Sequence, residues 1–247
     1  MTIVVRREVA VRIHPPVPGT LAQAGLLGGL GLQLGFGAAG WITSAVFVTA
    51  TWVLLSRALG RPEFHRWGPA DTVTYGRLIL TGGVTALLAE SLAGAPHHAV
   101  LIALAATSLA LDGVDGQVAR RTGTTSRFGA RFDMESDSVL AVVLSVYLAS
   151  MIGWWAVAIG LFRYAFVVAA WALPWLRGSL PYRMSRKVVA ASQGAVLVVA
   201  STGLLPTTVA QALVAVSIVS LIWSFGVDVR HLRRTAAPEL VPGYRSA

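Results

Sequence analysis

The sequence contains no cysteine and few charged residues. Without cysteine there can be no disulfide, no thiolate nucleophile and no zinc or iron–sulfur site built on cysteine ligands. Only 13% of the 247 residues are charged and 55% are hydrophobic, whereas a soluble domain would have about a quarter of its residues charged. The composition therefore excludes an ordinary water-soluble domain and indicates a membrane protein.

Acidic residues are scarcer than basic ones. The chain has 11 Asp and Glu against 20 Lys and Arg, a formal net charge of +9, and all but one of the basic residues are arginine. In a soluble protein this excess would suggest a nucleic-acid partner. Because most of this chain must face hydrocarbon, an anionic lipid surface or an anionic substrate fits the excess better. We expect the lipid bilayer as a partner and no nucleic acid.

Eight apolar segments are candidates for membrane helices, each of which takes about 20 residues to cross the hydrocarbon core. The first and seventh are short, and the first could be a tilted or re-entrant helix, so we expect eight spans with seven as the alternative. The predicted fold class is all-α, a polytopic transmembrane helical bundle. The segments are residues 20–36, 41–58, 74–93, 99–118, 133–151, 154–173, 188–202 and 206–226.

The positions of the basic residues predict the orientation of these spans. Loops on the cytoplasmic side of a membrane collect Lys and Arg. The loops at 37–40, 94–98, 152–153 and 203–205 contain neither residue, while the segments at the other ends of the spans are rich in arginine. We therefore expect a multi-pass protein of a bacterial plasma membrane with both termini in the cytoplasm. The predicted cytoplasmic segments are 1–19, 59–73, 119–132, 174–187 and 227–247.

Five of the eleven acidic residues lie between positions 112 and 137. A carboxylate near the membrane is costly unless it is paired or bound to a cation. Asp112 and Asp115 are three residues apart at the end of the fourth span, and Asp133 and Asp137 are four apart at the start of the fifth, so each pair shares a helix face. Such oxygen ligands suit Mg²⁺, Mn²⁺ or Ca²⁺. The sequence predicts a metal site that opens on the cytoplasmic side.

Small residues and an arginine surround these carboxylates. Gly116 and Ala119 follow the first pair on nearly the same helix face, and Gly129 precedes Asp133 by one turn. They would let a ligand approach the backbone closely. Arg120 offers a planar, permanently charged group that suits a phosphate.

An ion-pair cluster is the alternative to a metal site. The carboxylates could pair with Arg127 and Arg131 instead of binding a metal ion. Glu135 is offset on the helix from Asp133 and Asp137, so we expect it to be solvated or paired and not to be a ligand.

These residues resemble the signature of the CDP-alcohol phosphotransferases. Every fixed position of that signature is matched by Asp112-x-x-Asp115-Gly116-x-x-Ala119-Arg120, eight residues, then Gly129-x-x-x-Asp133-x-x-x-Asp137. The run Asp71-x-x-Thr74-x-x-Arg77 is similar to the N-x-x-T-x-x-R pattern at the start of the family's first core helix, with Asp in place of Asn. Residues 70–226 resemble the six-helix catalytic core. Residues 20–58 would be an extra N-terminal transmembrane hairpin, between a cytoplasmic segment 1–19 and a basic cytoplasmic tail 227–247.

The resemblance implies an enzyme that moves a phosphatidyl group from a CDP-lipid, CDP-diacylglycerol, to a polar alcohol with release of CMP. It implies that Asp112, Asp115 and Asp133 bind a pair of divalent ions, Mg²⁺ or Mn²⁺, and that Asp137 is a further ligand or the general base. It also implies a homodimer. The residues that it assigns to the CDP-lipid site are Asp71, Thr74, Gly116, Ala119, Arg120, Ser126 and Gly129.

The acceptor site is less defined. Arg163 lies near the middle of the sixth span, and Arg186 and Lys187 open the seventh. An intramembrane cation is a functional candidate, so the three could hold an anionic acceptor such as glycerol 3-phosphate or an inositol phosphate. Arg186 and Lys187 could equally be ordinary positive-inside anchors, and Arg163 could pair with a carboxylate.

A metal-coupled membrane transporter with an acidic cation site is the alternative function. Transport sites lie near the midplane of the bilayer and are often built from inverted repeats. The carboxylates of this chain lie at one end of the predicted spans, and no internal inverted repeat is evident. Both observations favour the enzyme.

Overall fold

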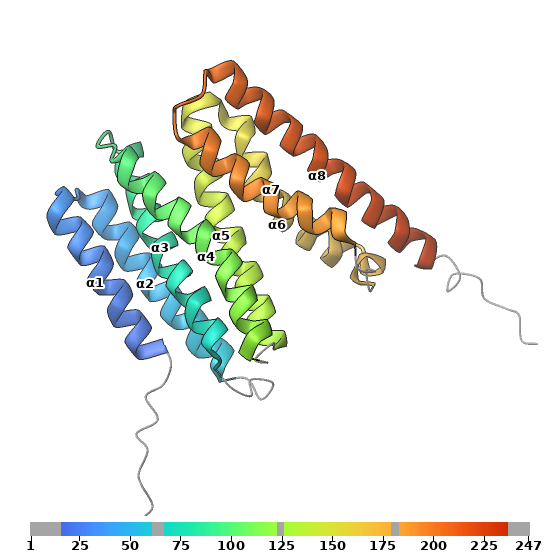
Figure 1. Cartoon of the computed structure of the whole chain (residues 1–247), viewed down its shortest axis with the longest axis horizontal. Helices are drawn as coiled ribbons and strands as arrows, with labels where there is room; N and C mark the ends of the chain where they lie inside the picture. Colours follow the sequence, from blue (N-terminus) through green and yellow to red (C-terminus); the bar gives the residue numbers. More distant parts are fainter. Residues whose placement is uncertain (1–15, 61–66, 123–125, 179–182, 237–247) are drawn as a thin grey trace, which may run out of the picture.

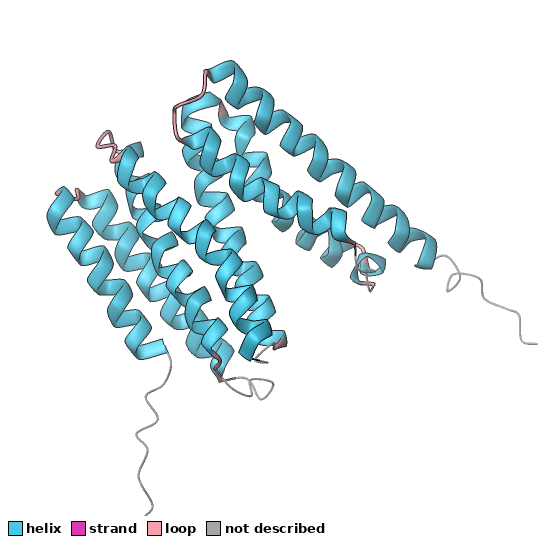
Figure 2. Cartoon of the chain, viewed as in Figure 1, coloured by secondary structure: helices cyan, strands magenta, loops and turns pink. Residues whose placement is uncertain are grey.

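The structure is a computed structural model that describes residues 16–60, 67–122, 126–178 and 183–236. Every regular element in these ranges is helical (Figure 2), so the prediction of an all-α fold is confirmed. The short 3-10 helices η1 and η2 cover Trp154–Ala156 and Pro174–Arg177. The α-helices are α1 (Pro16–Leu34), α2 (Ala38–Leu59), α3 (Pro69–Leu92), α4 (His98–Thr122), α5 (Arg127–Ile152), α6 (Val157–Ala172), α7 (Met184–Ser201) and α8 (Thr207–Ala236).

Six of these helices are long and apolar enough to cross a membrane: α2, α3, α4, α5, the η1–α6 segment and α8. Among the described residues α1 and α7, with 19 and 18 residues, are outside this set. Gln23 and Gln33 lower the hydropathy of α1, and α7 begins with Arg186 and Lys187. They are the two helices that correspond to the short apolar segments of the sequence. The six spans and their arrangement are those of a polytopic membrane bundle.

Four short connections lie at one end of the bundle (Figure 1), and each contains a glycine with positive φ. Such a backbone conformation costs glycine little because it has no Cβ, so the chain can reverse direction within a few residues. The start of α1 and the end of α8 lie at the opposite end. The glycines are Gly35, Gly94, Gly153 and Gly203, with φ of 68°, 93°, 119° and 70°.

Helix α3 lies between α4, α5 and the α1–α2 hairpin and contacts all of them. Its residues Val84 and Leu87 are fully buried, as are Leu148 of α5 and Leu197 of α7. Interhelical hydrogen bonds add to this packing, as is common in membrane bundles. His98 of α4, for example, contacts the Tyr147 hydroxyl of α5 at 2.6 Å and the carbonyl of Thr202, just after α7, at 2.8 Å.

The α1–α2 hairpin is attached to α3 near both ends of the bundle. The Gly40 N–H, in the first turn of α2, donates to the buried carboxylate of Glu90 over 2.7 Å. A first-turn N–H has no partner within its own helix, so Glu90 satisfies a group that would otherwise be unpaired. At the other end, the Thr20 and Tyr75 hydroxyls are 3.0 Å apart. The first contact attaches α2 to α3, and the second attaches α1 to α3.

Candidate active site

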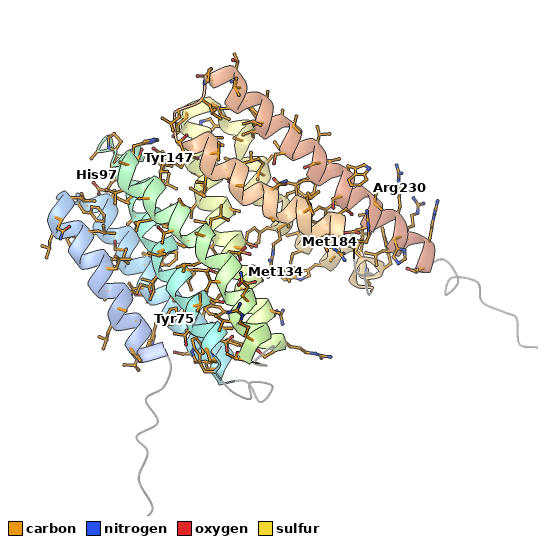
Figure 3. All side chains as sticks on the ribbon, viewed as in Figure 1. Tyr75, His97, Met134, Tyr147, Met184 and Arg230 are labelled. Atoms are coloured by element: carbon orange, nitrogen blue, oxygen red, sulfur yellow. The ribbon has the colours of Figure 1, made fainter. Side chains whose placement is uncertain are left out.

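Three carboxylates converge at the end of the bundle where α3 and α5 begin and α4 ends. Asp112 lies on α4, and Asp133 and Asp137 lie one turn apart on α5. One oxygen from each lies within 4.8 Å of the oxygens of the other two. Figure 3 shows this end by the labels of Tyr75 and Met134, on α3 and α5, far from His97 at the opposite end. The structure therefore brings together three of the four carboxylates expected to bind metal.

For four expected site residues the structure describes the backbone alone. Asp115, Ala119 and Arg120 are on α4, and Lys187 is on α7. Their side chains lie outside the part of the structure that is described. Gly116 lies on α4 one turn after Asp112.

Arg77 of α3 contacts all three carboxylates. Its Nη1 lies 2.9 Å from Asp112 Oδ1 and 2.6 Å from Asp133 Oδ1, and its Nη2 donates to Asp137 Oδ1. The side chain of Arg77 is 1% exposed, while those of Asp112 and Asp133 are 37% exposed. The buried guanidinium thus offsets part of the charge of the carboxylates from inside the bundle and leaves their outer sides accessible.

The backbone around Arg77 is held as well. Its Nε donates to the Ser108 carbonyl of α4 over 3.2 Å, and the Ser108 hydroxyl donates to the Arg77 carbonyl over 3.3 Å. Arg127 and Arg131, the partners expected in the ion-pair alternative, form no ion pair with these carboxylates among the described residues. The cation that pairs with them is instead Arg77, which α3 supplies from the buried side.

The starts of α3 and α5 meet at Asp71, Ser126 and Gly129. Asp71 is buried, and its Oδ2 accepts the Gly68 N–H at the start of α3 over 2.8 Å. Ser126 is the N-cap of α5, and its hydroxyl oxygen accepts the Gly129 N–H over 2.8 Å. A Cβ on Gly129 would lie only 2.7 Å from Asp71 Oδ1. Both polar side chains cap helices, and the glycine allows the two helix starts to approach each other.

Thr74 follows Asp71 by one turn of α3 and is also buried. Its hydroxyl donates to the Ala70 carbonyl over 3.2 Å. Asp71, Thr74 and Arg77 therefore follow one another along the side of α3 that faces α4 and α5.

The cations expected at the acceptor site contact different helices. Arg163 of α6 donates to Glu135 Oε1 over 2.6 Å and to the Met134 carbonyl over 2.7 Å, both on α5. Arg186 of α7 lies 3.3 Å from Asp228 Oδ2 of α8. Arg163 is thus paired with a carboxylate, as one alternative had it, and the expectation of a solvated or paired Glu135 is confirmed. Arg186 contacts a buried carboxylate on another helix, a contact that an ordinary positive-inside anchor does not need.

The model of the family described as CDP-alcohol phosphatidyltransferase matches residues 67–223, which is more than half of the chain. The chain belongs to this family. The CDP-alcohol phosphatidyltransferases are transferases for substituted phosphate groups, which move a phosphatidyl group from a CDP-alcohol to an alcohol. Comparisons with curated proteins and with solved structures found no match.

The matched residues of this CDP-alcohol phosphatidyltransferase extend from just before α3 into α8 and leave α1 and α2 outside. Members of the family typically depend on a divalent metal. Such an ion suits the cluster of Asp112, Asp133 and Asp137, whose carboxylate oxygens lie within 4.8 Å of one another. Divalent ions such as Mg²⁺ prefer oxygen ligands of this kind. The carboxylate cluster is therefore consistent with the metal dependence of the family.

Two residues of the transferase have contacts that sequence reasoning did not assign. Arg77 was recognised in the motif at the start of the core but was given no role, and the signal was its position one turn after Thr74. Asp228 is 4% exposed and lies within 3.3 Å of both Arg183 and Arg186. It is the sole carboxylate in α8, and a buried charge among arginines at the end of a span could have been noticed.

Proposed function

We propose that the protein transfers the phosphatidyl group of CDP-diacylglycerol to a polar alcohol acceptor and releases CMP. The observation that carries this proposal is the convergence of Asp112, Asp133 and Asp137, with oxygens within 4.8 Å, at one end of a bundle of apolar helices. A lipid donor can reach such a site from the bilayer, and a polar acceptor can reach it from water.

Asp112, Asp133 and Asp137, with Asp115 from the same motif, would hold Mg²⁺ or Mn²⁺, and the number of carboxylates suits two ions. When bound, the ions would neutralise the charge on the pyrophosphate during transfer. The outer sides of Asp112 and Asp133 are accessible, which is consistent with a ligand that binds from outside the bundle.

In the reaction, a bond forms between the acceptor hydroxyl oxygen and the phosphorus that carries the diacylglycerol. The bond between that phosphorus and the oxygen of CMP breaks, and CMP leaves with the electron pair. A carboxylate oxygen of Asp137 would accept the proton of the acceptor hydroxyl. For this the hydroxyl must bind within hydrogen-bond reach of Asp137, as for any general base. Arg77, which contacts Asp137 and is buried, would be a positioning residue that orients the carboxylates.

The CDP part of the donor would bind beside the starts of α3 and α5. Asp71, Thr74, Ser126 and Gly129 shape this region through the contacts between the two helix starts. The positive ends of both helix dipoles would favour a phosphate there. The family motif adds Gly116, Ala119 and Arg120 of α4.

We further propose an anionic acceptor, glycerol 3-phosphate or an inositol phosphate, held by Arg163, Arg186 and Lys187. Both Arg163 and Arg186 already contact a carboxylate. A guanidinium has five N–H donors, so an arginine that a carboxylate orients can still donate to a phosphate.

The site and both termini would face the cytoplasm of a bacterial cell. The loops at the opposite end of the bundle have no Lys or Arg, in agreement with the positive-inside rule. We also propose a homodimer that packs through α1. Added Cβ atoms at Gly25, Gly28 and Gly29 would meet no other atom within 4 Å, so this part of α1 is open to a close helix contact.

A CMP-release assay tests the function. The purified protein would be incubated with CDP-diacylglycerol and a panel of alcohols, with Mg²⁺, with Mn²⁺ and with a chelator. We expect CMP only with a divalent ion and with one acceptor strongly preferred. If no acceptor in the panel gave metal-dependent release of CMP, the proposal would be contradicted and the transporter alternative favoured.

A further inference from the structure

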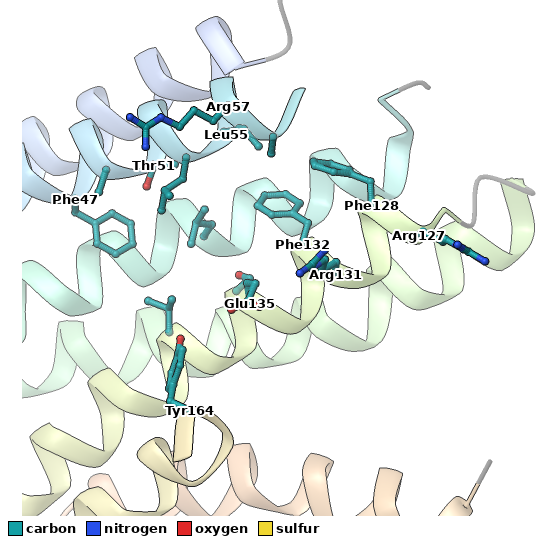
Figure 4. A pocket seen from close by; sticks show the side chains of 16 residues that line it. Phe47, Thr51, Leu55, Arg57, Arg127, Phe128, Arg131, Phe132, Glu135 and Tyr164 are labelled. Atoms are coloured by element: carbon teal, nitrogen blue, oxygen red, sulfur yellow. The ribbon is translucent and has the colours of Figure 1, made fainter. Parts of the chain in front are cut away.

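A cavity of about 1140 Å³ lies between α2, α3, α5 and α6 (Figure 4). Its volume exceeds the roughly 300–1,000 Å³ of most small-molecule pockets. Phe47 and Leu55 of α2 face Phe132 of α5 across it, and Tyr164 of α6 lies on the far side. One wall is therefore made by the N-terminal hairpin, which lies outside the residues that the family model matches.

The cavity is separate from the carboxylate cluster. The α5 residues that line it include Phe128, Arg131, Glu135 and Val139, at helical spacings of three and four. They lie on the side of α5 opposite to Asp133 and Asp137, because each residue turns the helix by about 100°. Neither Asp133 nor Asp137 lines the cavity.

The wall of the cavity has an apolar part and a cationic part. Phe47, Leu54 and Leu78 supply apolar surface. Arg57 and Arg131 supply positive charge near the end where α2 stops and α5 starts, and Arg127, which also lines the cavity, lies at its edge (Figure 4). Among the described residues neither Arg57 nor Arg131 has an ion-pair partner. Glu135, the acidic residue in the wall, is paired with Arg163.

This division matches the two parts of an anionic phospholipid. Its acyl chains would lie along the apolar wall, where their burial from water is favourable. Its phosphate would lie at the end with the arginines, whose planar groups bind phosphate through paired hydrogen bonds. A zwitterionic lipid would bring the cation of its own headgroup next to Arg57 and Arg131 and would fit less well.

We propose that this cavity binds one anionic diacyl phospholipid that takes no part in the transfer reaction. The lipid joins the N-terminal hairpin to α5 and α6 through its chains and its phosphate. The proposal is independent of the proposed function, because none of the carboxylates of the reaction site contributes to the cavity.

Lipid retention tests the proposal. The full chain would be purified in mild detergent, incubated with dioleoyl-phosphatidylglycerol or dioleoyl-phosphatidylcholine, washed, and examined by native mass spectrometry. We expect about one phosphatidylglycerol and no phosphatidylcholine retained for each chain. The double variant Arg57→Gln/Arg131→Gln should retain at least tenfold less, and Leu54→Trp, which fills the cavity without changing charge, should lose the lipid as well.

Two control variants sharpen the comparison. Arg233→Gln/Arg234→Gln removes the same charge from exposed positions at the end of α8 and should leave retention unchanged. Asp112→Asn, in the carboxylate cluster, should abolish CMP release and leave retention unchanged, so a failure of either proposal can be told from a failure of the other. Equal retention by all variants, or equal retention of both lipids, would overturn the proposal. Displacement of the lipid by one equivalent of CDP-diacylglycerol would also overturn it and assign the cavity to the donor.

Discussion

Arg77 Nη1 lies 2.6 Å from Asp133 Oδ1, and this contact joins α3 to α5 at the centre of the carboxylate cluster. The same guanidinium reaches Asp112 on α4. One buried arginine thus links the three helices that form the site. Because Asp112 is on α4 and Asp133 and Asp137 are on α5, we expect this arginine to hold the two helices in their relative position at the site.

Replacement of Arg77 by alanine should therefore damage both stability and activity. It would leave three carboxylates close together without the cation that α3 supplies. We expect the free energy of unfolding to fall by about 3 kcal/mol, the low end for a broken buried ion pair, because the carboxylates are partly exposed. The measurement is unfolding in mixed micelles. Arg121→Ala, at an exposed position of α4, should change stability by no more than about 0.5 kcal/mol, and an equal effect of the two variants would contradict the role of Arg77.

Asp137→Asn should abolish most CMP release while the protein remains folded. An amide cannot accept the proton of the acceptor hydroxyl, and loss of a general base costs about 10²–10⁴-fold in rate. The rate of CMP release and the melting temperature would be measured on the same preparation. Glu135→Gln is the matched control on the same helix. Because Glu135 pairs with Arg163, its loss should act on the KM for the acceptor, so at saturating acceptor the variant should keep its rate within a few fold. Full activity of Asp137→Asn would refute its assignment as the base.

Helical periodicity was sufficient to predict that Asp133 and Asp137 share one face of a helix, because residues four apart do so. That Asp112 lies beside them required the fourth and fifth helices to be neighbours, which their short connection favours. The apolar segments predicted eight spans, with seven as the alternative. The described residues contain a helix for each segment, but six of these helices are long and apolar enough to cross a membrane, and the short first and seventh segments correspond to the other two. The insertion of Arg77 between α4 and α5 could not be predicted this way, since it depends on how α3 packs between them. The contact of Asp228 with Arg186 likewise depends on how α7 packs against α8. The cavity beside α2 depends on where the hairpin sits on α3, which no local pattern encodes.

Gly129→Ala should lower stability and weaken binding of the CDP-lipid. The new Cβ would lie 2.7 Å from Asp71 Oδ1 and 3.1 Å from Ser126 Oγ. Asp71 would have to move and so lose its bond with the Gly68 N–H. Overpacking of this kind costs about 1–3 kcal/mol. The readouts are the free energy of unfolding and the KM for CDP-diacylglycerol.

The control for this substitution is Gly113→Ala on α4. A Cβ at Gly113 would meet nothing within 4 Å, and alanine is favoured over glycine inside a helix by about 0.5–1 kcal/mol. Gly113→Ala should therefore leave stability unchanged or raise it. If both alanine variants behaved alike, the close approach of α5 to α3 at Gly129 would not be important.

Asp228→Asn should affect the acceptor and not the donor. Asp228 lies 3.2 Å from Arg183 Nη1 and 3.3 Å from Arg186 Nη1, so its charge orients both arginines from the buried side of α8. Loss of a hydrogen bond to a charged group costs about 1.5–3 kcal/mol, and about 1.4 kcal/mol corresponds to a tenfold change in affinity. We expect the KM for the acceptor to rise at least tenfold and the KM for CDP-diacylglycerol to stay the same. A variant that raised both KM values together, or that lowered only kcat, would show that Asp228 supports the fold of α7 and α8 without positioning Arg186 for the acceptor.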